Sequence, residues 1–500
     1  MSRKVVLFYP PYEGNPLGAP LCLLALAAKL RESGFEPVII DAAVEAGYKS
    51  TVCEALDGAL CLGVSVLTGP MISGAIDVAK LAKSLYPKLP VIFGGWHPTL
   101  QPDQTLAEPY VDVVVRGQGE ITLCELAEAF ATNRPLKNIS GISWKTGAIR
   151  THNPDRKVEA LEDLPIAAFD MVDFDAYERI EGTRKLAYAT SIGCPYACNY
   201  CTDMIFYKRR FNALSAERVV RELVELVTRY RIREVALLDS NFPVDLKRAI
   251  AIAKGIYESG VKFHWTFQAS TDFICRMSEE DIRMLGASGV TYMGFGTESS
   301  SESVLKLMNK RHQRVDEMYE TARRAAIGGI KVTFNLIFGY PGETEADRQI
   351  TFKTMSDIAR QYSNVRFSPN IFTPYPGIPI WPQLRELGVE EPKTLAAWGD
   401  LALGINMLPW LKGTNLNRFN LMLSYFLLNA QLARSGKSRH KGIVPNLIRI
   451  IVSQSVRWRI QKNRYSLPWE IWFAPFTERI VMRRSLITGK ELPTEAINAC

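Results

Sequence analysis

Short apolar runs alternate with helical patterns from the first residue to about residue 130. The apolar runs predict β-strands at Val5–Tyr9, Pro37–Asp41, Cys61–Leu67, Val91–Phe93 and Val111–Val115. Apolar residues at helical spacing lie between them, at about Leu21–Ser33, Ile72–Ser84 and Thr122–Ala131. Strands that alternate with helices predict a parallel, doubly wound α/β domain, in which ligands bind beyond the carboxyl ends of the strands.

The same alternation resumes after a polar connection between residues of about 132 and 180. Apolar runs predict six further strands at Leu186–Ser191, Val235–Leu238, His264–Ala269, Val290–Phe295, Val332–Phe338 and Arg366–Phe372. Each run ends in a turn of polar or glycine residues. Six strand–helix units predict a partial (β/α)6 TIM barrel, and barrel active sites lie at the carboxyl ends of the strands.

The turns that follow the third, fourth and fifth strands of the first domain are rich in small and polar residues. They contain Ser65, Leu67 and Thr68, then Gly94, Gly95 and His97, and then Gly117. Glycine lets a backbone approach a bulky ligand closely. Ordinary Rossmann-like turns are also glycine-rich, so each turn alone is a weak signal.

Three cysteines after the first barrel strand carry the most specific chemistry. They read Cys194-Pro-Tyr-Ala-Cys198-Asn-Tyr-Cys201 and follow a glycine. Iron–sulfur cubes usually take four thiolates, so three leave one iron without a protein ligand. An open metal position is a place where a substrate or cofactor binds.

Two other interpretations of the cysteines are weaker. A buried helical face would also place them together, but Gly193 and Pro195 favour a loop. A structural zinc site would need a fourth Cys or His nearby, and the nearest histidines are the distant His152 and His264.

The cysteine spacing resembles the signature of radical S-adenosylmethionine (SAM) enzymes. The turns of the first domain resemble the cobalamin-binding domain that precedes many radical SAM domains, and the resemblance spans roughly Lys4–Trp381. It implies three cofactors: a [4Fe–4S] cluster on the three cysteines, SAM on the open iron, and cobalamin within the first-domain turns. In that family the reduced cluster splits SAM into methionine and a 5′-deoxyadenosyl radical.

The chain is predicted to have four parts, the first three of them implied by the resemblance. Residues 1–135 would be the Rossmann-like cobalamin-binding domain, 136–183 a linker, 184–395 the radical SAM core, and 396–500 a mainly helical, basic C-terminal region. Many cobalamin domains carry a cobalt-ligating His in a D-x-H-x-x-G motif. The equivalent place, Asp41–Gly47, has none, and His97 is interpreted as a loop residue near the ligand.

Several residues of the core would contact SAM by the same resemblance. They are Tyr200, Asp239, Asn241, Gln268, Ser270, Glu298 and Gly339. The ring of Tyr200 would lie near adenine, although loop packing alone would also explain an aromatic residue there. Glu298 would contact SAM, the alternative being an ordinary solvated carboxylate. Glu343 is interpreted as a charge at a helix N-terminus.

The chain carries a net charge of +8, and its basic residues are unevenly spread. From Leu401 to Trp469 there are eleven Lys and Arg and no Asp or Glu. This segment would be a helical cap with a solvated basic face, a surface for phospholipid with Trp at the boundary, or a site for an anionic substrate. Nucleic acid is not expected because no recognisable module is present.

The composition predicts a cytoplasmic protein. Nine cysteines without a signal peptide indicate a reducing compartment, and no apolar run reaches the about 18 residues of a spanning helix, so any membrane contact would be peripheral. The resemblance implies a C-methyltransferase that works through a 5′-deoxyadenosyl radical and methylcobalamin. A non-methylating radical cyclase, oxidase or rearrangement enzyme, and a non-catalytic cobalamin-binding sensor, are the alternatives.

The expected partners are small. A small-molecule substrate is implied, and a lipid or isoprenoid suits the basic, aromatic C-terminal region. An electron donor such as ferredoxin or flavodoxin would reduce the cluster. No Ser–His–Asp set or carboxylate pair suggests another chemistry, so no catalytic side chain is assigned.

Overall fold

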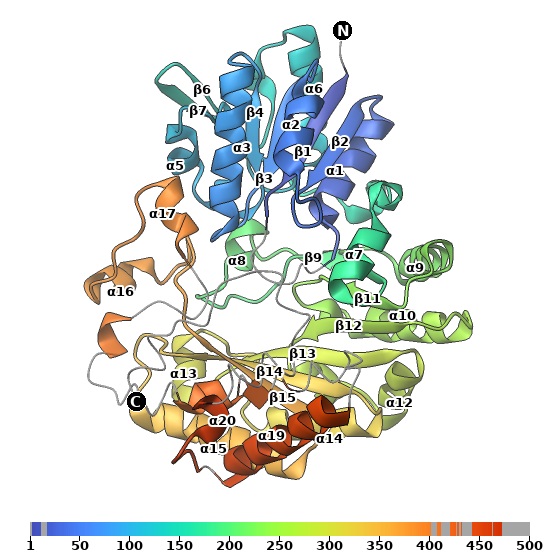
Figure 1. The fold of residues 1–500 in the computed structure, drawn as a ribbon, viewed down its shortest axis with the longest axis vertical. Coiled ribbons are helices and arrows are strands. Elements are labelled where there is room, and N and C mark those ends of the chain that lie inside the picture. The colour runs from blue at the N-terminus through green and yellow to red at the C-terminus, as the bar shows by residue number, and fades with distance from the viewer. Residues whose placement is uncertain are drawn as a thin grey trace. The chain divides into compact units, whose positions relative to one another are not determined.

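The fold is taken from a computed structural model that describes residues 3–11, 18–401, 408–411, 421–426, 428–429, 432, 443–462 and 464–472. The chain divides into two compact units. The first contains Met1–Val244, Ser259–Phe263 and Pro374–Ala402, and the second contains Asp245–Glu258, His264–Thr373 and Leu403–Cys500. Each unit is described by itself (Figure 1).

The first unit is built on a seven-stranded sheet of order β2-β1-β3-β4-β5-β6-β7. Its parallel strands are β1 (Lys4–Tyr9), β2 (Glu36–Asp41), β3 (Cys61–Ser65), β4 (Val91–Gly94) and β5 (Val113–Val115). Its helices are α1 (Leu21–Glu32), α2 (Tyr48–Leu56), α3 (Met71–Leu85), α4 (Trp96–Leu100), α5 (Pro102–Ala107) and α6 (Glu120–Thr132). The predicted doubly wound α/β domain is therefore confirmed.

The middle of β1, from Val5 to Phe8, is completely buried, as expected for a parallel strand covered on both faces. The sheet also gains an edge that the sequence did not predict. In the stretch interpreted as a polar connection, β6 (Ile142–Thr146) and β7 (Ile149–His152) form an antiparallel hairpin on β5.

The remainder of the first unit contains the beginning of the core. Its elements are α7 (Phe174–Glu181), β8 (Lys185–Tyr188), β9 (Ser191–Ile192), α8 (Asp203–Phe206), β10 (Asn212–Ala213), α9 (Ala216–Tyr230), β11 (Glu234–Leu237), α16 (Trp381–Glu386) and α17 (Leu395–Gly399). Strands β8 and β11 pair in parallel. The segment with α17 returns to the first domain, where the indole N–H of Trp398 donates to Oε1 of Gln104 at 2.9 Å.

The second unit contains the other four predicted barrel strands, paired in parallel in the order β12, β13, β14, β15. They are β12 (His264–Ala269), β13 (Val290–Glu298), β14 (Lys331–Phe338) and β15 (Val365–Ile371). Its helices are α10 (Leu246–Glu258), α11 (Asp272–Arg276), α12 (Glu279–Ala287), α13 (Glu302–Leu307), α14 (Glu317–Ile327), α15 (Glu345–Gln361), α19 (Ile443–Lys462) and α20 (Trp469–Trp472). All six predicted strands of the core therefore form.

The rings of Phe295, Phe334 and Phe367 pack in a tilted arrangement across three strands of this sheet, each neighbouring pair with centroids 5.9 Å apart. The ring of Phe426 adds to them at 5.6 Å from Phe367. Residues before α19 thus complete the core of the second unit.

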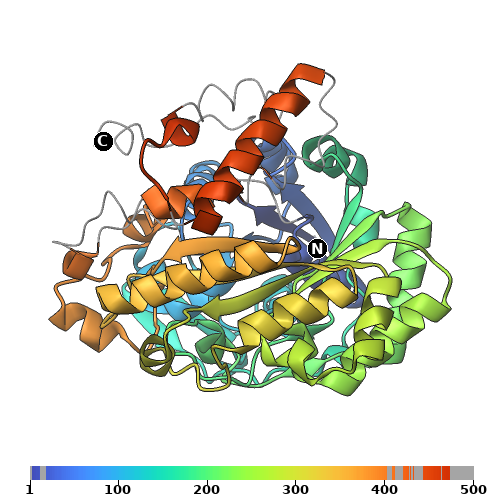
Figure 2. The same ribbon diagram turned by 90° about the horizontal axis from the view of Figure 1, so that it is seen from below.

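The C-terminal region is helical where it is described, in α19 and α20 (Figure 2). The prediction for residues 396–500 also covers 402–407, 412–420, 433–442 and 473–500, which lie outside the described residues. Among the helices that the structure describes, none combines the length and the apolarity that a membrane span requires.

Candidate cofactor-binding site

The three predicted cluster cysteines lie on a loop between β9 and α8. Gly193 begins the loop with a φ of +77°, and a Cβ atom there would lie 2.1 Å from the carbonyl oxygen of Arg210. Only glycine fits that close approach. The backbone N–H of Cys201 donates to the carbonyl of Cys198 at 3.1 Å, which folds the loop back on itself.

The loop keeps its thiols away from water. Cys198 is buried, and the other two cysteines are half-buried. Burial raises the pKa of Cys201 to about 12, and the charge of Asp203 and the thiols of Cys198 and Cys194 act in the same direction. A thiolate there needs a positive partner, which metal ligation supplies.

The donor set consists of three cysteine thiols on one loop. Among the described residues, no three His, Cys, Asp or Glu side chains are grouped closely enough to hold one metal ion. Three soft sulfur ligands agree with the open [4Fe–4S] site that the spacing predicts.

Asp239, predicted to contact SAM, has both carboxylate oxygens directed to the start of the cluster loop. It is 1% exposed. Oδ1 accepts the backbone N–H of Thr190 at 2.8 Å, and Oδ2 accepts the hydroxyls of Thr190, at 2.5 Å, and Ser191. Asp239 therefore ties the end of β11 to the residues that lead into the cysteines.

Two residues near the cysteines, Asp203 and Ser240, were not predicted as site residues. Asp203 opens α8 and is buried, and its Oδ1 accepts the hydroxyl of Ser240 at 2.9 Å. Its Oδ2 has no hydrogen-bond partner among the described residues, and burial raises the pKa of Asp203 to about 6. In the sequence, only the position of Asp203 two residues after Cys201 could have indicated its place beside the cluster loop. Tyr200 is half-buried and Asn241 is buried in the same region.

The cobalamin-type turns are bound to one another at the ends of β3 and β4. The hydroxyl of Thr68 lies 3.1 Å from Nδ1 of His97, and the backbone N–H of His97 donates to the carbonyl of Val66 at 3.1 Å. His97 is completely buried, and burial lowers its pKa to about 4. Its Nε2 has no partner among the described residues. His97 is thus a buried residue at the start of α4, whereas the sequence predicted a loop residue near the ligand.

The glycines of these turns serve two different purposes. A Cβ atom on Gly95 would lie 3.1 Å from the carbonyl of Val66, so Gly95 permits close packing within the protein. A Cβ atom on Gly117 would meet nothing within 4 Å, and Gly94 makes only ordinary contacts. The Sγ of Cys22 lies 3.4 Å from the Oγ of Ser65 at the end of β3. Leu67, in the first of these turns, is half-buried.

The cobalamin-type turn and the cluster loop meet within the first unit. The ring of Trp96, between Gly95 and His97, lies 4.3 Å from the ring of Phe206 and 5.8 Å from that of Tyr207. Both rings lie at the end of α8, the short helix that follows the cluster cysteines. The two predicted cofactor segments are therefore in contact through aromatic packing.

In the second unit, Glu298 ends β13 in a strained backbone conformation. Its φ is +58°, which is unusual for a residue other than glycine, and the register with β14 shifts between Gly296 and Glu298. Its carboxylate is buried and lies 3.5 Å from Nζ of Lys310, which is also buried. Strained residues of this kind gather at functional sites.

The strand before Glu298 offers two further predicted residues. Gln268 is exposed on β12, with its side-chain amide lying against the backbone of Gly294. Ser270 is buried, and its hydroxyl donates to Asp272 at 2.6 Å. Of the two, Gln268 is the one with an accessible polar group.

Gly339 lies between a carboxylate and a C-terminal segment. Its N–H donates to Oε2 of Glu343 at 2.6 Å, and its carbonyl accepts the indole N–H of Trp410 at 3.0 Å. Side-chain carbons of Leu408 and Leu411 would lie 3.2 and 3.1 Å from a Cβ atom there. Glu343 directly precedes Thr344, the N-cap of α15, and its carboxyl group is buried against the glycine turn, 3.3 Å from Nη1 of Arg348.

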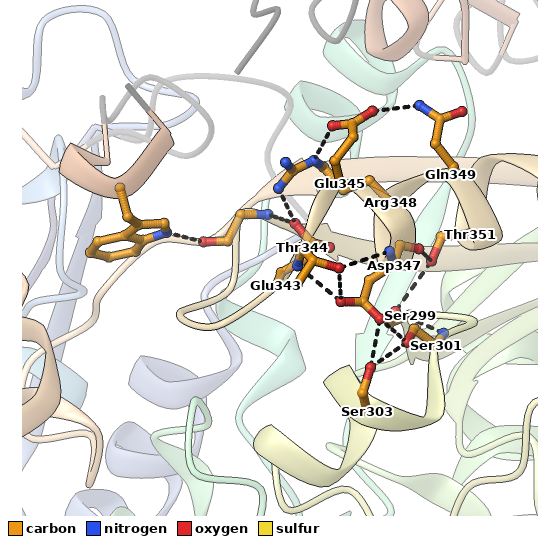
Figure 3. A network of polar contacts seen from close by, with 12 residues as sticks. Ser299, Ser301, Ser303, Glu343, Thr344, Glu345, Asp347, Arg348, Gln349 and Thr351 are labelled. Carbon is orange, nitrogen blue, oxygen red and sulfur yellow. Dashed lines mark hydrogen bonds and ion pairs between the residues drawn. The ribbon is translucent and has the colours of Figure 1, made fainter. Parts of the chain in front are cut away.

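Asp347 joins the two turns that contain Glu298 and Gly339 (Figure 3). It accepts the hydroxyls of Ser301 and Ser303 on one side, at 2.5 and 2.6 Å, and that of Thr344 on the other, at 2.5 Å. Burial alone would raise the pKa of Asp347, but these hydrogen bonds outweigh burial and lower it. The serines after β13 are therefore held by the first turn of α15.

Comparison with known proteins agrees with this arrangement. Residues 4–127 match the B12 binding domain, and residues 188–355 match the radical SAM superfamily. The chain is 31% identical, over 76% of its length and 82% of the relative, to an uncharacterised methyltransferase of Pyrococcus horikoshii. It is 25% identical to the hopanoid C-3 methylase of Methylococcus capsulatus, over 72% and 68% of the two chains.

A solved structure has the same fold. The cobalamin-dependent SAM radical enzyme OxsB, with aqua-cobalamin and SAM bound, matches 99% of this chain and 77% of its own, with a TM-score of 0.75 and 16% identity. The chain therefore belongs to the cobalamin-dependent radical SAM enzymes. The cofactors of this family are a [4Fe–4S] cluster, SAM and cobalamin.

Proposed function

We propose that this radical SAM enzyme is a C-methyltransferase that replaces a hydrogen on an unactivated carbon with a methyl group. One observation supports it above the others: Trp96 of the cobalamin-type turn packs on Phe206 and Tyr207 at the end of α8, after the cluster cysteines. Methyl transfer to a substrate radical needs the methyl donor beside the place where the radical forms. The methyltransferase relative supports the same reaction.

The proposed reaction consumes two SAM molecules for each methyl group. When bound, the cluster and SAM supply a 5′-deoxyadenosyl radical and cobalamin carries the methyl group. The substrate C–H bond breaks, its hydrogen leaves in 5′-deoxyadenosine, and a C–CH3 bond forms. The products are methionine, 5′-deoxyadenosine, S-adenosylhomocysteine and methylated substrate, and balance requires two electrons from a reduced donor such as ferredoxin or flavodoxin.

The roles of the side chains are part of the proposal. Cys194, Cys198 and Cys201 would hold the cluster. Tyr200, Asn241, Gln268, Ser270, Glu298 and Gly339 would contact SAM, and Ser65, Leu67, Thr68, Gly94, Gly95, His97 and Gly117 would surround cobalamin. For Asp239 we propose positioning of the cluster loop, because Thr190 and Ser191 already occupy both of its oxygens.

Products of SAM test the reaction. The protein would be purified without oxygen, loaded with cluster and cobalamin, and given SAM and a reductant. Formation of both 5′-deoxyadenosine and S-adenosylhomocysteine, each lost in Cys198→Ala, would support methyl transfer. 5′-Deoxyadenosine alone, with candidate substrate present, would point to a radical enzyme that does not methylate. Neither product under any condition would favour the cobalamin-binding sensor.

The contact between the two cofactor segments gives a sharper test. Trp96→Ala removes both ring contacts, each aromatic pair being worth about 0.5–1.5 kcal/mol. We expect the variant to keep its iron content and to form 5′-deoxyadenosine, while the ratio of methylated product to 5′-deoxyadenosine falls. Trp144→Ala, in the β6–β7 hairpin, is the control. An unchanged ratio in Trp96→Ala would contradict the placement argument.

Substrate and location are also proposals. A small apolar molecule of the lipid or isoprenoid class suits the basic and aromatic C-terminal region, and the hopanoid C-3 methylase is a relative whose name refers to a lipid. We propose a cytoplasmic protein with peripheral membrane contact. Extraction of lipids after incubation with methyl-labelled SAM would test the substrate class, and label confined to water-soluble products would contradict it.

A further inference from the structure

Helix α19 has apolar residues on two opposite faces. Val452, Val456 and Ile460 recur every four residues and are buried, so they form the face that packs on the protein. Leu447 and Ile451 are also four residues apart, but they are 55% and 52% exposed. A helix packed by one face usually has a polar outer face, so the apolar outer face of α19 requires an explanation.

The exposed face continues along most of the helix. Trp458 lies seven residues after Ile451, on the same side of the helix, and is 48% exposed. Ile450 lies next to this face and is 43% exposed. We call Leu447, Ile450, Ile451 and Trp458 the outer ridge. Arg457 lies next to this ridge on the helix surface.

A polar groove of about 390 Å³ lies beside the outer ridge, between α19 and the end of α15. Arg360 and Ser363 line one side, and Gln454, Arg457 and Trp458 line the other. The side-chain amide of Gln461 donates to the carbonyl of Ala359 at 3.4 Å and joins the two helices at the groove.

Arg457 lines this groove, and Arg366, on β15, lies near enough for the charge of Arg457 to act on it; neither arginine has an acidic partner among the described residues. Nη1 of Arg366 donates to the carbonyls of Ser363, at 3.2 Å, and Val365, at 2.7 Å, and its Nε is buried without a partner in the described part of the chain. Burial lowers the pKa of Arg366, and the nearby charge of Arg457 lowers it further. Arg360, in contrast, is paired with Asp357.

The chemistry of the groove therefore favours an oxyanion. The guanidinium group of Arg457 lines the groove without an acidic partner among the described residues, and a phosphate there would form charge-assisted hydrogen bonds with it. The segment from Leu401 to Trp469 has no Asp or Glu, so no acidic side chain within it competes for Arg457.

A phosphate alone would leave the outer ridge in water. Basic residues beside exposed Leu, Ile and Trp are the surface that lies in the interface of an anionic bilayer, with the cations at headgroups and the apolar side chains at the acyl boundary. We propose that α19 docks this protein on an anionic phospholipid surface, with a headgroup phosphate at Arg457 and the outer ridge at the acyl boundary. This inference does not depend on which radical reaction the enzyme performs.

Vesicle co-sedimentation of the full chain tests the proposal. We expect binding to phosphatidylcholine vesicles that contain phosphatidylglycerol, little binding to phosphatidylcholine alone, and release as salt screens the charges. Arg457→Gln should weaken binding about fivefold, the worth of one basic residue near an anionic surface. The double variant Leu447→Ser with Ile451→Ser should lower total vesicle binding and also the fraction of binding that remains at high salt.

Matched controls separate a surface effect from loss of folding. Lys331→Gln removes an exposed charge and Ile149→Ser an exposed apolar side chain elsewhere, and neither should change vesicle binding. All variants should still form 5′-deoxyadenosine from SAM, because none touches the proposed cofactor site. A failure of docking with that activity intact leaves the proposed reaction standing.

Three results would overturn the inference. The first is no binding to anionic vesicles at low salt. The second is stabilisation by inorganic phosphate, lost in Arg457→Gln, without vesicle binding, which would assign the groove to a free anion. The third is self-association that the double variant abolishes, which would show that a second copy of the chain covers the outer ridge.

Discussion

The role of Asp239 is the point at which the structure and the family resemblance differ most usefully. The resemblance implies a contact with SAM, whereas the structure directs its carboxylate to Thr190 and Ser191 at the start of the cluster loop. Asp239→Asn and Asp239→Ala distinguish the two roles. The positioning role predicts that cluster retention suffers first and that SAM affinity follows only through the cluster.

The size of the effect follows from the three hydrogen bonds. In Asp239→Asn the amide oxygen can still accept the N–H of Thr190, and the two hydroxyls can turn to accept from the amide. The loss is then that of the charge, about 1–2 kcal/mol. Asp239→Ala leaves the buried Thr190 N–H without an acceptor and opens a cavity, so it should cost about 3–5 kcal/mol.

The assay measures three quantities on anaerobically prepared protein: iron per chain, the midpoint of thermal unfolding, and the Kd for SAM in the fraction that holds a full cluster. Asp239→Ala should lower the midpoint by at least about 6 °C, at about 2–4 °C per kcal/mol for a domain of this size. Asp239→Asn should lower iron content with little change in the Kd of the loaded fraction. Asp245→Asn, at an exposed helix start, is the control.

One outcome would refute the positioning role. If Asp239→Asn keeps full iron and an unchanged unfolding midpoint but binds SAM at least tenfold more weakly, the carboxylate acts on SAM directly. A weakened SAM contact with a normal cluster cannot arise from hydrogen bonds that hold the loop.

Further predictions concern the glycine turns and one buried carboxylate. Trp410→Ala removes one hydrogen bond to Gly339 and should weaken SAM binding about three- to tenfold in calorimetry, with Trp410→Phe also affected because the lost group is the indole N–H. Gly193→Ala should abolish cluster retention because its Cβ atom would clash with a backbone oxygen. In Gly117→Ala the new Cβ atom meets no other atom, so the variant should cost only about 1 kcal/mol of φ strain. Its main effect should be a lower affinity for cobalamin in titrations. Burial raises the pKa of Glu343 to about 7, so folding favours the neutral form of its carboxyl group. The free energy of unfolding should therefore fall as pH rises from about 4.5 through 7, by an upper limit of about 3 kcal/mol. Glu343→Gln should flatten this pH dependence in thermal melts.

The sequence predicted the strands and the cluster loop well because their signals are local. Apolar runs of β-branched and aromatic residues bounded by glycine turns indicate a strand without reference to the rest of the chain. All five strands of the first domain and all six of the core form close to their predicted positions. The hairpin of β6 and β7 was missed because its outer strand has no apolar alternation: Ile149 there is exposed.

The sequence could not predict contacts between residues that are far apart in the chain. Trp410 donates to the carbonyl of Gly339 across 71 positions, and nothing near either residue announces the other. The pairing of Lys310 with Glu298 is similar, since a lysine twelve residues after a carboxylate is on its own an ordinary surface charge. Such contacts are decided by tertiary packing.

A polar residue at the carboxyl end of a strand is in the right place for a ligand, but its place does not decide its role. Asp239 directs both oxygens to Thr190 and Ser191, while Thr68 and His97 bond to each other. Their position arises from the fold, and these polar atoms already serve it. The second oxygen of Asp203 and Nε2 of His97 are different, because each is buried and has no hydrogen-bond partner among the described residues. Since buried polar groups in folded proteins are almost always paired, unused capacity beside a cofactor loop is the stronger indication of a ligand contact than position alone. By this criterion Asp203 ranks above Asp239 as a group that meets a cofactor.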